Sequence, residues 1–262
     1  MESLLNHPWP LGALMGLLLS ATIEVGYQTA LRSRIQQDAN RKDQMVAVRD
    51  GLFLLVSLLL GFTLALAAPR FAERRSLVIE EANAIGTTYL RAGALPQPYH
   101  DQAQQLLRDY VDARLDLDKA GLDDSRANEA TARANQIQER LWEGTIQVTS
   151  ADRSPITALY MNSLNETIDL HEKRLSSLEN RIPRSVWLLI FCVSLIAVFT
   201  RGLTLAGRFW LTLVLVPLTI AIVVALIADL DTPSSGLIRL DQRSMQRLKV
   251  EINAPSSAAQ RR

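Results

Sequence analysis

Charged residues are absent from four long stretches of the sequence, and this constrains the fold more than any other feature. A helix needs about 20 mainly apolar residues to cross the hydrocarbon core of a bilayer, with a range of about 17 to 25. Two of the stretches reach this length. Arginine side chains at the ends, or local thinning of the bilayer, can accommodate the two shorter ones. We therefore expect four transmembrane helices at Leu11–Ile23, Gly51–Pro69, Ser185–Thr200 and Phe209–Ala228.

The alternative is a soluble protein in which the same four stretches are buried core helices. Phe209–Ala228 argues against it, because this stretch is apolar on every side of a helix and has no polar face for water. We therefore expect these helices to be surrounded by the lipid bilayer. The expected location is integral to the membrane, in a bacterial inner (plasma) membrane.

The order of the stretches predicts a topology of two transmembrane hairpins. Gln28–Asp50 connects the first two spans, and Arg201–Arg208 connects the last two. An even number of spans places both termini and the middle of the chain on one side, although the distribution of Lys and Arg leaves that side open. The expected domains are a first transmembrane hairpin (1–69), a helical extramembrane domain (70–184), a second transmembrane hairpin (185–230) and an amphipathic C-terminal tail (231–262).

The middle of the chain is predicted to be helical throughout, because it lacks a sustained two-residue alternation. We expect helices over Phe71–Arg91, Asp101–Leu117, a segment around Ala127–Leu141, and from Pro155 to Ile182 with Ser154 as its N-cap. The whole chain is therefore expected to be all-α.

The helix that begins at Pro155 carries a heptad repeat of mainly apolar residues. Its members are Met161, Leu164, Ile168, His171, Leu175, Leu178 and Ile182. Such a seam needs a partner, which is either another helix of the same chain or the same helix of a second subunit.

The C-terminal tail also has two distinct faces. One is basic and the other apolar, formed by Arg239, Arg243 and Arg247 and by Met245, Leu248 and Ile252. This pattern fits a helix lying on anionic lipid. It fits equally a helix docked on the middle domain.

Small residues at helical spacing mark places where helices can pack closely. Gly12 and Gly16 form a GxxxG pattern in the first span, and Gly61 follows Ser57 by four residues in the second. Gly86 lies within an expected helix, where glycine costs about 1 kcal/mol relative to alanine. We expect Gly12, Gly16, Gly61 and Gly86 to be helix-packing positions, within one subunit or between subunits.

Polar residues gather where the helices over 71–91 and 155–182 each adjoin a membrane span. Because both helices start or end at the membrane, their polar side chains are expected to meet in a juxtamembrane polar cluster. Its members are Arg74, Arg75, Glu80, Glu81, Asn83, Asn165, Asp169 and Arg174. The cluster is either a functional site or a structural network of salt bridges.

Several classes of function lack support in the sequence. Cys192 is the only cysteine, so the chain has no internal disulfide and no cysteine-built zinc site. The 28 basic and 27 acidic residues give a net charge of +1, which provides no general basic surface for nucleic acid. No nucleotide-binding or hydrolase motif is present, and the three histidines are scattered. We expect no enzyme activity, no cofactor, no metal site and no nucleic-acid partner.

Four groups of residues together resemble the bestrophin-like family of membrane proteins. They are Arg74-Arg75 with Glu80-Glu81, Asn83, Gly86-Thr87, Tyr89 and Arg91; Tyr110 with Ala113-Arg114; Leu164-Asn165-Glu166 with Asp169 and Arg174; and Asp229 with Asp231, Pro233 and Gly236. The resemblance implies a four-span helical protein with a helical domain inserted between spans two and three. It also implies kinship with bestrophins, which are homo-oligomeric anion channels.

The function implied by this resemblance is a homo-oligomeric ion channel that carries anions. Its partners would be the lipid bilayer, further copies of the chain and inorganic ions. Pore-lining candidates are Glu24, Ser57 and Phe62. The alternative is a non-conducting membrane scaffold or sensor whose helical domain binds a partner.

Overall fold

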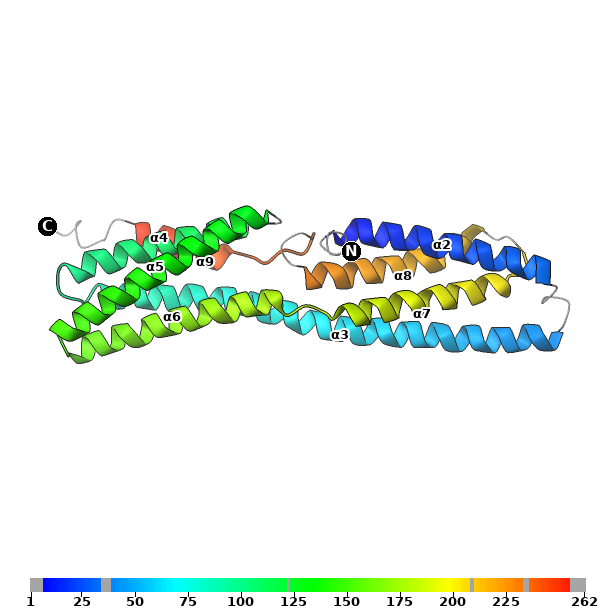
Figure 1. The fold of residues 1–262 in the computed structure, drawn as a ribbon, viewed down its shortest axis with the longest axis horizontal. Coiled ribbons are helices and arrows are strands. Elements are labelled where there is room, and N and C mark those ends of the chain that lie inside the picture. The colour runs from blue at the N-terminus through cyan, green and yellow to red at the C-terminus, as the bar shows by residue number, and fades with distance from the viewer. Residues whose placement is uncertain (1–6, 34–38, 122, 208–209, 233–235, 255–262) are drawn as a thin grey trace. The chain divides into compact units, whose positions relative to one another are not determined.

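The computed structural model describes residues 7–33, 39–121, 123–207, 210–232 and 236–254 (Figure 1). Arg208, Phe209, Pro233 and the last eight residues of the expected tail lie outside this part of the chain. The described residues form helices and no strands, as the all-α prediction requires. In chain order the helices are α2 (Pro8–Ser33), α3 (Ala39–Ala92), α4 (Tyr99–Ala120), α5 (Asp124–Ala151), α6 (Pro155–Glu179), α7 (Arg184–Leu203), α8 (Trp210–Asp231) and α9 (Arg243–Asn253).

The chain divides into two compact units. Unit 1 comprises residues 1–71 and 181–238, and unit 2 comprises residues 72–180 and 239–262. The long helix α3 contributes its first part to unit 1 and its second part to unit 2.

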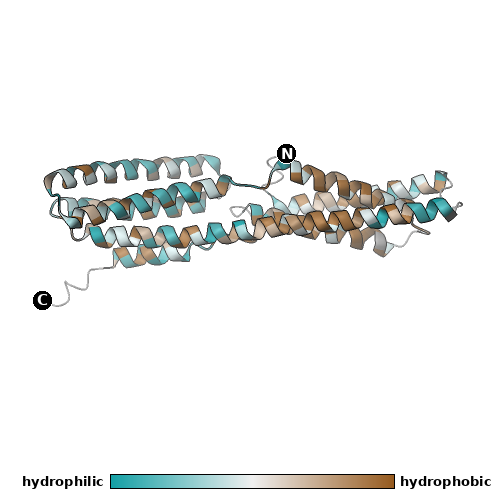
Figure 2. Cartoon of the chain, turned by 90° about the horizontal axis from the view of Figure 1, so that it is seen from below, coloured by the Kyte–Doolittle hydropathy of each residue, from teal (hydrophilic) through white to brown (hydrophobic). Residues whose placement is uncertain are grey.

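Unit 1 consists of α2, α7, α8 and the first part of α3, and these helices are strongly apolar (Figure 2). Within the described residues, four helical segments are long and apolar enough to cross a membrane. Their core side chains include Leu19, Ile23, Ile190 and Ile227. Large apolar side chains also point outward, such as Leu17, which is 71% exposed. Apolar residues both inside and outside are expected of helices surrounded by lipid.

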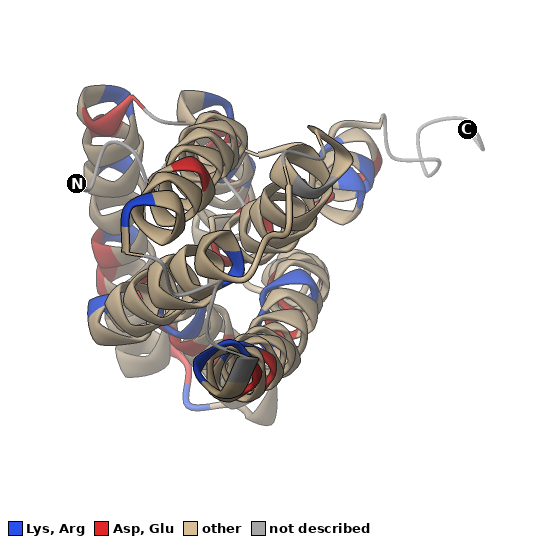
Figure 3. Cartoon of the chain, turned by 90° about the vertical axis from the view of Figure 1, so that its right-hand side faces the viewer, with Lys and Arg blue, Asp and Glu red and all other residues tan. Residues whose placement is uncertain are grey.

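The end-on view in Figure 3 shows where charge remains along these helices. Uncharged ribbon dominates, and ribbon segments coloured as Lys or Arg lie at several helix ends. Arg32 ends α2, and Arg201 lies in the last turn of α7. Charged residues therefore flank the apolar spans, as snorkelling at a membrane surface requires.

Helix α2 packs closely against both α7 and α8 through small residues. A Cβ atom added to Gly12 would lie 2.7 Å from the Ala225 Cβ, and one added to Gly16 would lie 3.3 Å from the Ala221 Cβ. The approach is closer still where α2 crosses α7, because a Cβ on Gly202 would meet the backbone of Ile23. The predicted packing at Gly12 and Gly16 thus occurs within one chain.

Unit 2 is a bundle of α4, α5, α6, α9 and the second part of α3. Helix α9 packs on α4 and buries Met245, Leu248 and Ile252, while Tyr89 donates a hydrogen bond to the Ile252 carbonyl (3.1 Å). Of the two alternatives for the tail, the structure therefore shows the docked helix. A Cβ on Gly86 would lie 3.2 Å from Leu248, so Gly86 leaves room for α9.

Helix α6 begins as predicted but ends earlier. Ser154 accepts a hydrogen bond from the Thr157 amide, which confirms the N-cap. The helix ends at Glu179, so the predicted continuation of the heptad seam to Ile182 is wrong. Two causes are visible. Proline disfavours the helical conformation of the residue before it, and Ile182 precedes Pro183. In addition, Arg74 donates to the carbonyls of Ser177 and Asn180 (both 2.9 Å), which satisfies the end of the helix.

Candidate functional site

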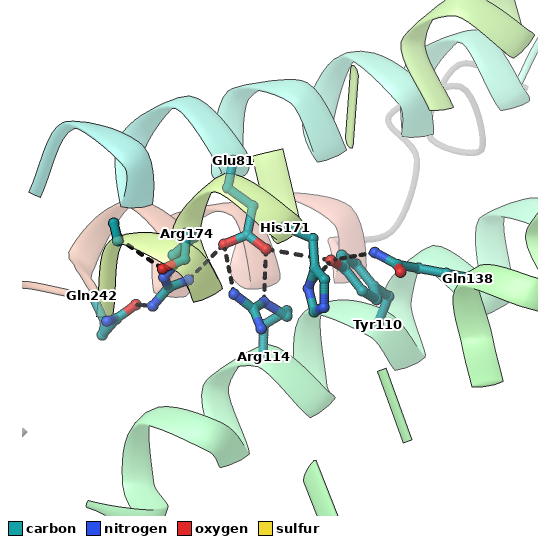
Figure 4. A network of polar contacts seen from close by, with 8 residues as sticks. Glu81, Tyr110, Arg114, Gln138, His171, Arg174 and Gln242 are labelled. Carbon is teal, nitrogen blue, oxygen red and sulfur yellow. Dashed lines mark hydrogen bonds and ion pairs between the residues drawn. The ribbon is translucent and has the colours of Figure 1, made fainter. Parts of the chain in front are cut away.

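The most unusual feature of unit 2 is a buried carboxylate held by two buried guanidinium groups (Figure 4). Glu81 of α3 is fully buried. Arg114 of α4 places Nε 2.7 Å from Glu81 Oε1 and donates from Nη2 to Oε2 (3.2 Å). Arg174 of α6 donates from Nη1 to Oε2 at 2.6 Å. Charge-assisted hydrogen bonds of this kind are about twice as strong as neutral ones.

Three neutral side chains extend this arrangement toward α5. The Tyr110 hydroxyl lies 3.3 Å from Glu81 Oε1 and 3.0 Å from His171 Nδ1, and the Gln138 amide donates to its oxygen at 3.0 Å. Because a hydroxyl has one proton, Tyr110 donates to Glu81 or to His171 at any moment.

The segment just before α9 also takes part in this arrangement. Gln242 Oε1 accepts a hydrogen bond from Arg174 Nη2 at 3.2 Å. We call Glu81, Tyr110, Arg114, Gln138, His171, Arg174 and Gln242 the Glu81 network (Figure 4). It joins α3, α4, α5, α6 and the start of α9, which are far apart in sequence.

The two arginines decide the charge state of this site. Burial alone would keep Glu81 protonated, but Arg114 and Arg174 outweigh burial and hold its pKa below the ordinary value. Burial, together with Arg114, lowers the pKa of His171 to about 4. At neutral pH the Glu81 network therefore contains two positive charges, one negative charge and a neutral imidazole.

The chemistry available here is hydrogen bonding and charge compensation. The Glu81 network contains no cysteine, serine or lysine to act as a nucleophile beside a base. Within the described ranges, no three His, Cys, Asp or Glu side chains are grouped so as to hold a metal ion. The geometry thus favours the interpretation of a structural salt-bridge network, one of the two that the sequence left open.

The structure brings together only part of the predicted juxtamembrane polar cluster. Glu81 and Arg174 form an ion pair, and Arg74 is buried against the end of α6. The remaining members, Arg75, Glu80, Asn83, Asn165 and Asp169, are all exposed. Glu80 accepts a hydrogen bond from its neighbour Ser76 (2.7 Å).

Sequence reasoning missed five members of the Glu81 network, because only Glu81 and Arg174 belong to the predicted juxtamembrane polar cluster. Tyr110 and Arg114 entered only through the family resemblance, and His171 only as a member of the heptad repeat. The available signal was that Arg114 follows Leu107 and Tyr110 at a spacing of three and four, so an arginine continues an apolar stripe. Gln138 and Gln242 gave no signal, because isolated glutamines are common on helix surfaces.

The three pore-lining candidates lie apart from one another. Glu24 of α2 is half-buried and accepts from Gln28 (3.0 Å). Ser57 and Phe62 are both on α3, but five residues at 100° each place them about 140° apart around the helix. Phe62 belongs instead to an exposed row on α3, which we call the α3 row: Leu54, Leu58, Phe62 and Leu66.

Gly61 differs from the other three predicted packing glycines. A Cβ placed on it would meet nothing within 4 Å in this chain. Gly61 instead lines a groove on unit 1 between α3 and α8.

Comparison with known proteins agrees with this architecture. A model of the bestrophin-like domain matches residues 15–245. A crystal structure of a bacterial bestrophin homologue from Klebsiella pneumoniae, a tyrosine-to-alanine variant, aligns with a TM-score of 0.67 and 16% identity over 93% of this chain and 99% of that one. A second structure of a bacterial bestrophin homologue from the same organism, solved by Zn-SAD phasing, aligns with a TM-score of 0.63 and 18% identity. The alignment covers 92% of this chain and 96% of that one.

No curated protein matches the chain. At 16–18% identity, the solved structures establish a shared fold and no more. The family model, however, covers most of the sequence. The chain therefore belongs to the bestrophin-like family of membrane proteins.

Proposed function

We propose that this chain is the subunit of a homo-oligomeric ion channel in which several copies surround a pore that carries anions. Membership in the bestrophin-like family supports this proposal, because the resemblance to bestrophins implies oligomeric anion channels. The membrane in question would be a bacterial inner membrane.

In this proposal unit 1 is the membrane part. Helices α2 and α3 form one transmembrane hairpin, α7 and α8 form the other, and unit 2 lies outside the bilayer as an insertion between spans two and three. The interior of unit 1 is filled by side chains such as Leu19, Ile23 and Ile190. A single subunit therefore offers no hydrated path, and a pore requires a closed ring of copies.

The observation that carries the proposal is the α3 row. Leu54, Leu58, Phe62 and Leu66 are 73%, 50%, 62% and 54% exposed, while Val56 and Leu60 on the opposite side are buried. At 1.5 Å per residue the row is about 18 Å long. Around a symmetry axis, one such row from each copy would form a narrow apolar constriction, of the kind that gates ion flow by dewetting.

Flux measurements on the purified protein in liposomes test this proposal. A chloride gradient should drive flux through the wild-type protein, and Phe62→Ala should raise the flux several-fold by widening the constriction. Leu188→Ala is the matched control, because Leu188 is 55% exposed on α7 and outside the α3 row. Its flux should equal that of the wild type.

Two results would overturn the proposal. The absence of flux in both wild type and Phe62→Ala, under any ion gradient, would favour the alternative of a non-conducting scaffold or sensor. A reversal potential that follows the cation gradient would retain the channel but remove anion selectivity.

A further inference from the structure

A groove of about 620 Å³ opens on unit 1 between α3 and α8, near the end of α7. Its volume lies within the range of about 300 to 1,000 Å³ that is usual for small-molecule sites. Three charged residues, Arg49, Asp50 and Arg201, lie at one end. The walls are mainly apolar and include Phe53, Leu60, Leu64, Val216 and Val223.

The apolar walls of the groove offer no free hydrogen-bond donor for an anion. Ser57 and Thr219 are the only two hydroxyl residues that line it. Ser57 donates to the Phe53 carbonyl and Thr219 to the Val216 carbonyl, each at 2.9 Å within its own helix. The long part of the groove therefore suits a hydrocarbon chain better than water or an ion.

Among the described residues, the charged end of the groove carries one more positive than negative charge, because Arg49 and Arg201 share the carboxylate of Asp50. Arg49 pairs directly with Asp50, with Nη2 2.8 Å from Oδ1, and it also donates a hydrogen bond to Thr204 (3.2 Å). Arg201 forms no hydrogen bond or ion pair with its side chain in the part of the chain that the structure describes. A guanidinium placed at the end of a membrane span, beside an apolar groove, is suited to a phosphate oxygen.

We propose that this groove binds an anionic phospholipid, with its phosphate on Arg201 and one acyl chain between α3 and α8. From Arg49 to Leu64 the groove wall follows α3 for about 22 Å, which exceeds the roughly 15 Å depth of one leaflet of a 30 Å hydrocarbon core. The inference rests on the proposed insertion of unit 1 into a bilayer, and it does not depend on ion conduction.

The headgroup contact is tested by native mass spectrometry of the full chain with dioleoyl phosphatidylglycerol and dioleoyl phosphatidylcholine. These lipids have the same acyl chains and differ in headgroup charge. The wild type should bind the anionic lipid more tightly, and Arg201→Gln should weaken that binding about fivefold, as expected for one basic residue at a membrane surface. Binding of phosphatidylcholine should not change.

Arg32→Gln is the control for general surface charge, because Arg32 is an exposed basic residue at the end of α2. It should leave the affinity for phosphatidylglycerol unchanged. The proposal is overturned if Arg32→Gln weakens binding as much as Arg201→Gln, or if the wild type binds both lipids equally.

The acyl-chain contact is tested by Gly61→Leu, with Gly51→Leu as its matched control. Both glycines lie in α3 with nothing within 4 Å of an added Cβ, but only Gly61 lines the groove. Gly61→Leu should remove the bound phosphatidylglycerol while the lipid-free protein keeps its thermal stability and its oligomeric state. Gly51→Leu should bind as the wild type does.

Two outcomes distinguish the lipid from other occupants and from the proposed function. If Gly61→Leu dissociates the oligomer, the groove holds a second copy of the chain and the lipid proposal is wrong. If phosphatidylglycerol binding behaves as expected while liposome flux is absent, the lipid site stands and the channel proposal fails.

Discussion

At the scale of single residues, the buried ion pairs of Glu81 have a large energetic consequence. Removing one partner of a buried ion pair typically costs about 3–5 kcal/mol, because the other charge is left buried without compensation. Glu81 compensates two guanidinium groups, so its carboxylate is the only described acidic group in contact with both Arg114 and Arg174.

We predict that Glu81→Gln destabilises the protein by about 3–5 kcal/mol, because Arg114 and Arg174 would then remain buried without a counter-charge. Thermal unfolding of the detergent-solubilised protein measures this. Glu80→Gln, one residue away on the exposed side of α3, should stay within about 0.5 kcal/mol of the wild type. Equal unfolding temperatures for the two variants would contradict the assignment.

His171 makes stability depend on pH in a defined window. Its folded pKa of about 4 lies below the ordinary value of 6.5 because it is buried and faces Arg114. Above pH 6.5 the imidazole is neutral in both folded and unfolded states and contributes no pH dependence. As the pH falls from 6.5 to 4, only the unfolded state takes up the proton, so stability is lost at up to about 1.4 kcal/mol per pH unit.

We predict that His171→Gln flattens the stability profile between pH 6.5 and 4, because glutamine does not titrate. The measurement is the unfolding temperature as a function of pH for both proteins. Identical slopes for wild type and His171→Gln would show that the imidazole is not excluded from protonation.

At the scale of helices, the crossing of α2 and α7 depends on two glycines, Gly26 of α2 and Gly202 of α7. A Cβ on Gly202 would meet the Ile23 carbonyl and would lie 2.8 Å from the Tyr27 amide nitrogen. Both contacts are with backbone atoms, which cannot turn aside as a side chain can, so the two helices would have to move apart.

We predict that Gly202→Ala lowers stability by about 1–3 kcal/mol, the usual cost of overpacking. Gly51→Ala is the control. The added Cβ of Gly51→Ala meets open space. Because alanine replaces glycine within a helix, the free energy of unfolding should rise by about 0.5–1 kcal/mol. The two unfolding temperatures in one detergent check this, and a stabilised Gly202→Ala would refute the close crossing.

The helices could be predicted because their signals are local. Unbroken apolar runs identified the spans, and Ser154-Pro155 identified the start of α6. The glycine contact at Gly202 could not be predicted, because it depends on Ile23, which is distant in sequence. The end of α6 has a local cause in Pro183, but its second cause, Arg74, is also distant in sequence and gave no signal. Glu81 and Arg174 were expected to meet, and they do. The rest of the Glu81 network escaped prediction because it joins five segments that are distant in sequence.

At the scale of the whole molecule, the proposed ring of subunits would bring the α3 rows of neighbouring copies together near the axis. In a Cys192→Ala background, a short bis-maleimide should therefore cross-link Leu58→Cys between copies. Leu188→Cys, on the exposed side of α7, should remain uncross-linked. Denaturing gel electrophoresis measures the fraction of cross-linked chains. Equal cross-linking of both variants would contradict the placement of the α3 row.

The single native cysteine also gives a direct way to count subunits. Cys192 is exposed on α7, and no other thiol competes with it for a label. A membrane-permeant maleimide dye would attach once per chain. In single-molecule fluorescence, the number of photobleaching steps from one labelled particle then equals the number of chains that particle contains.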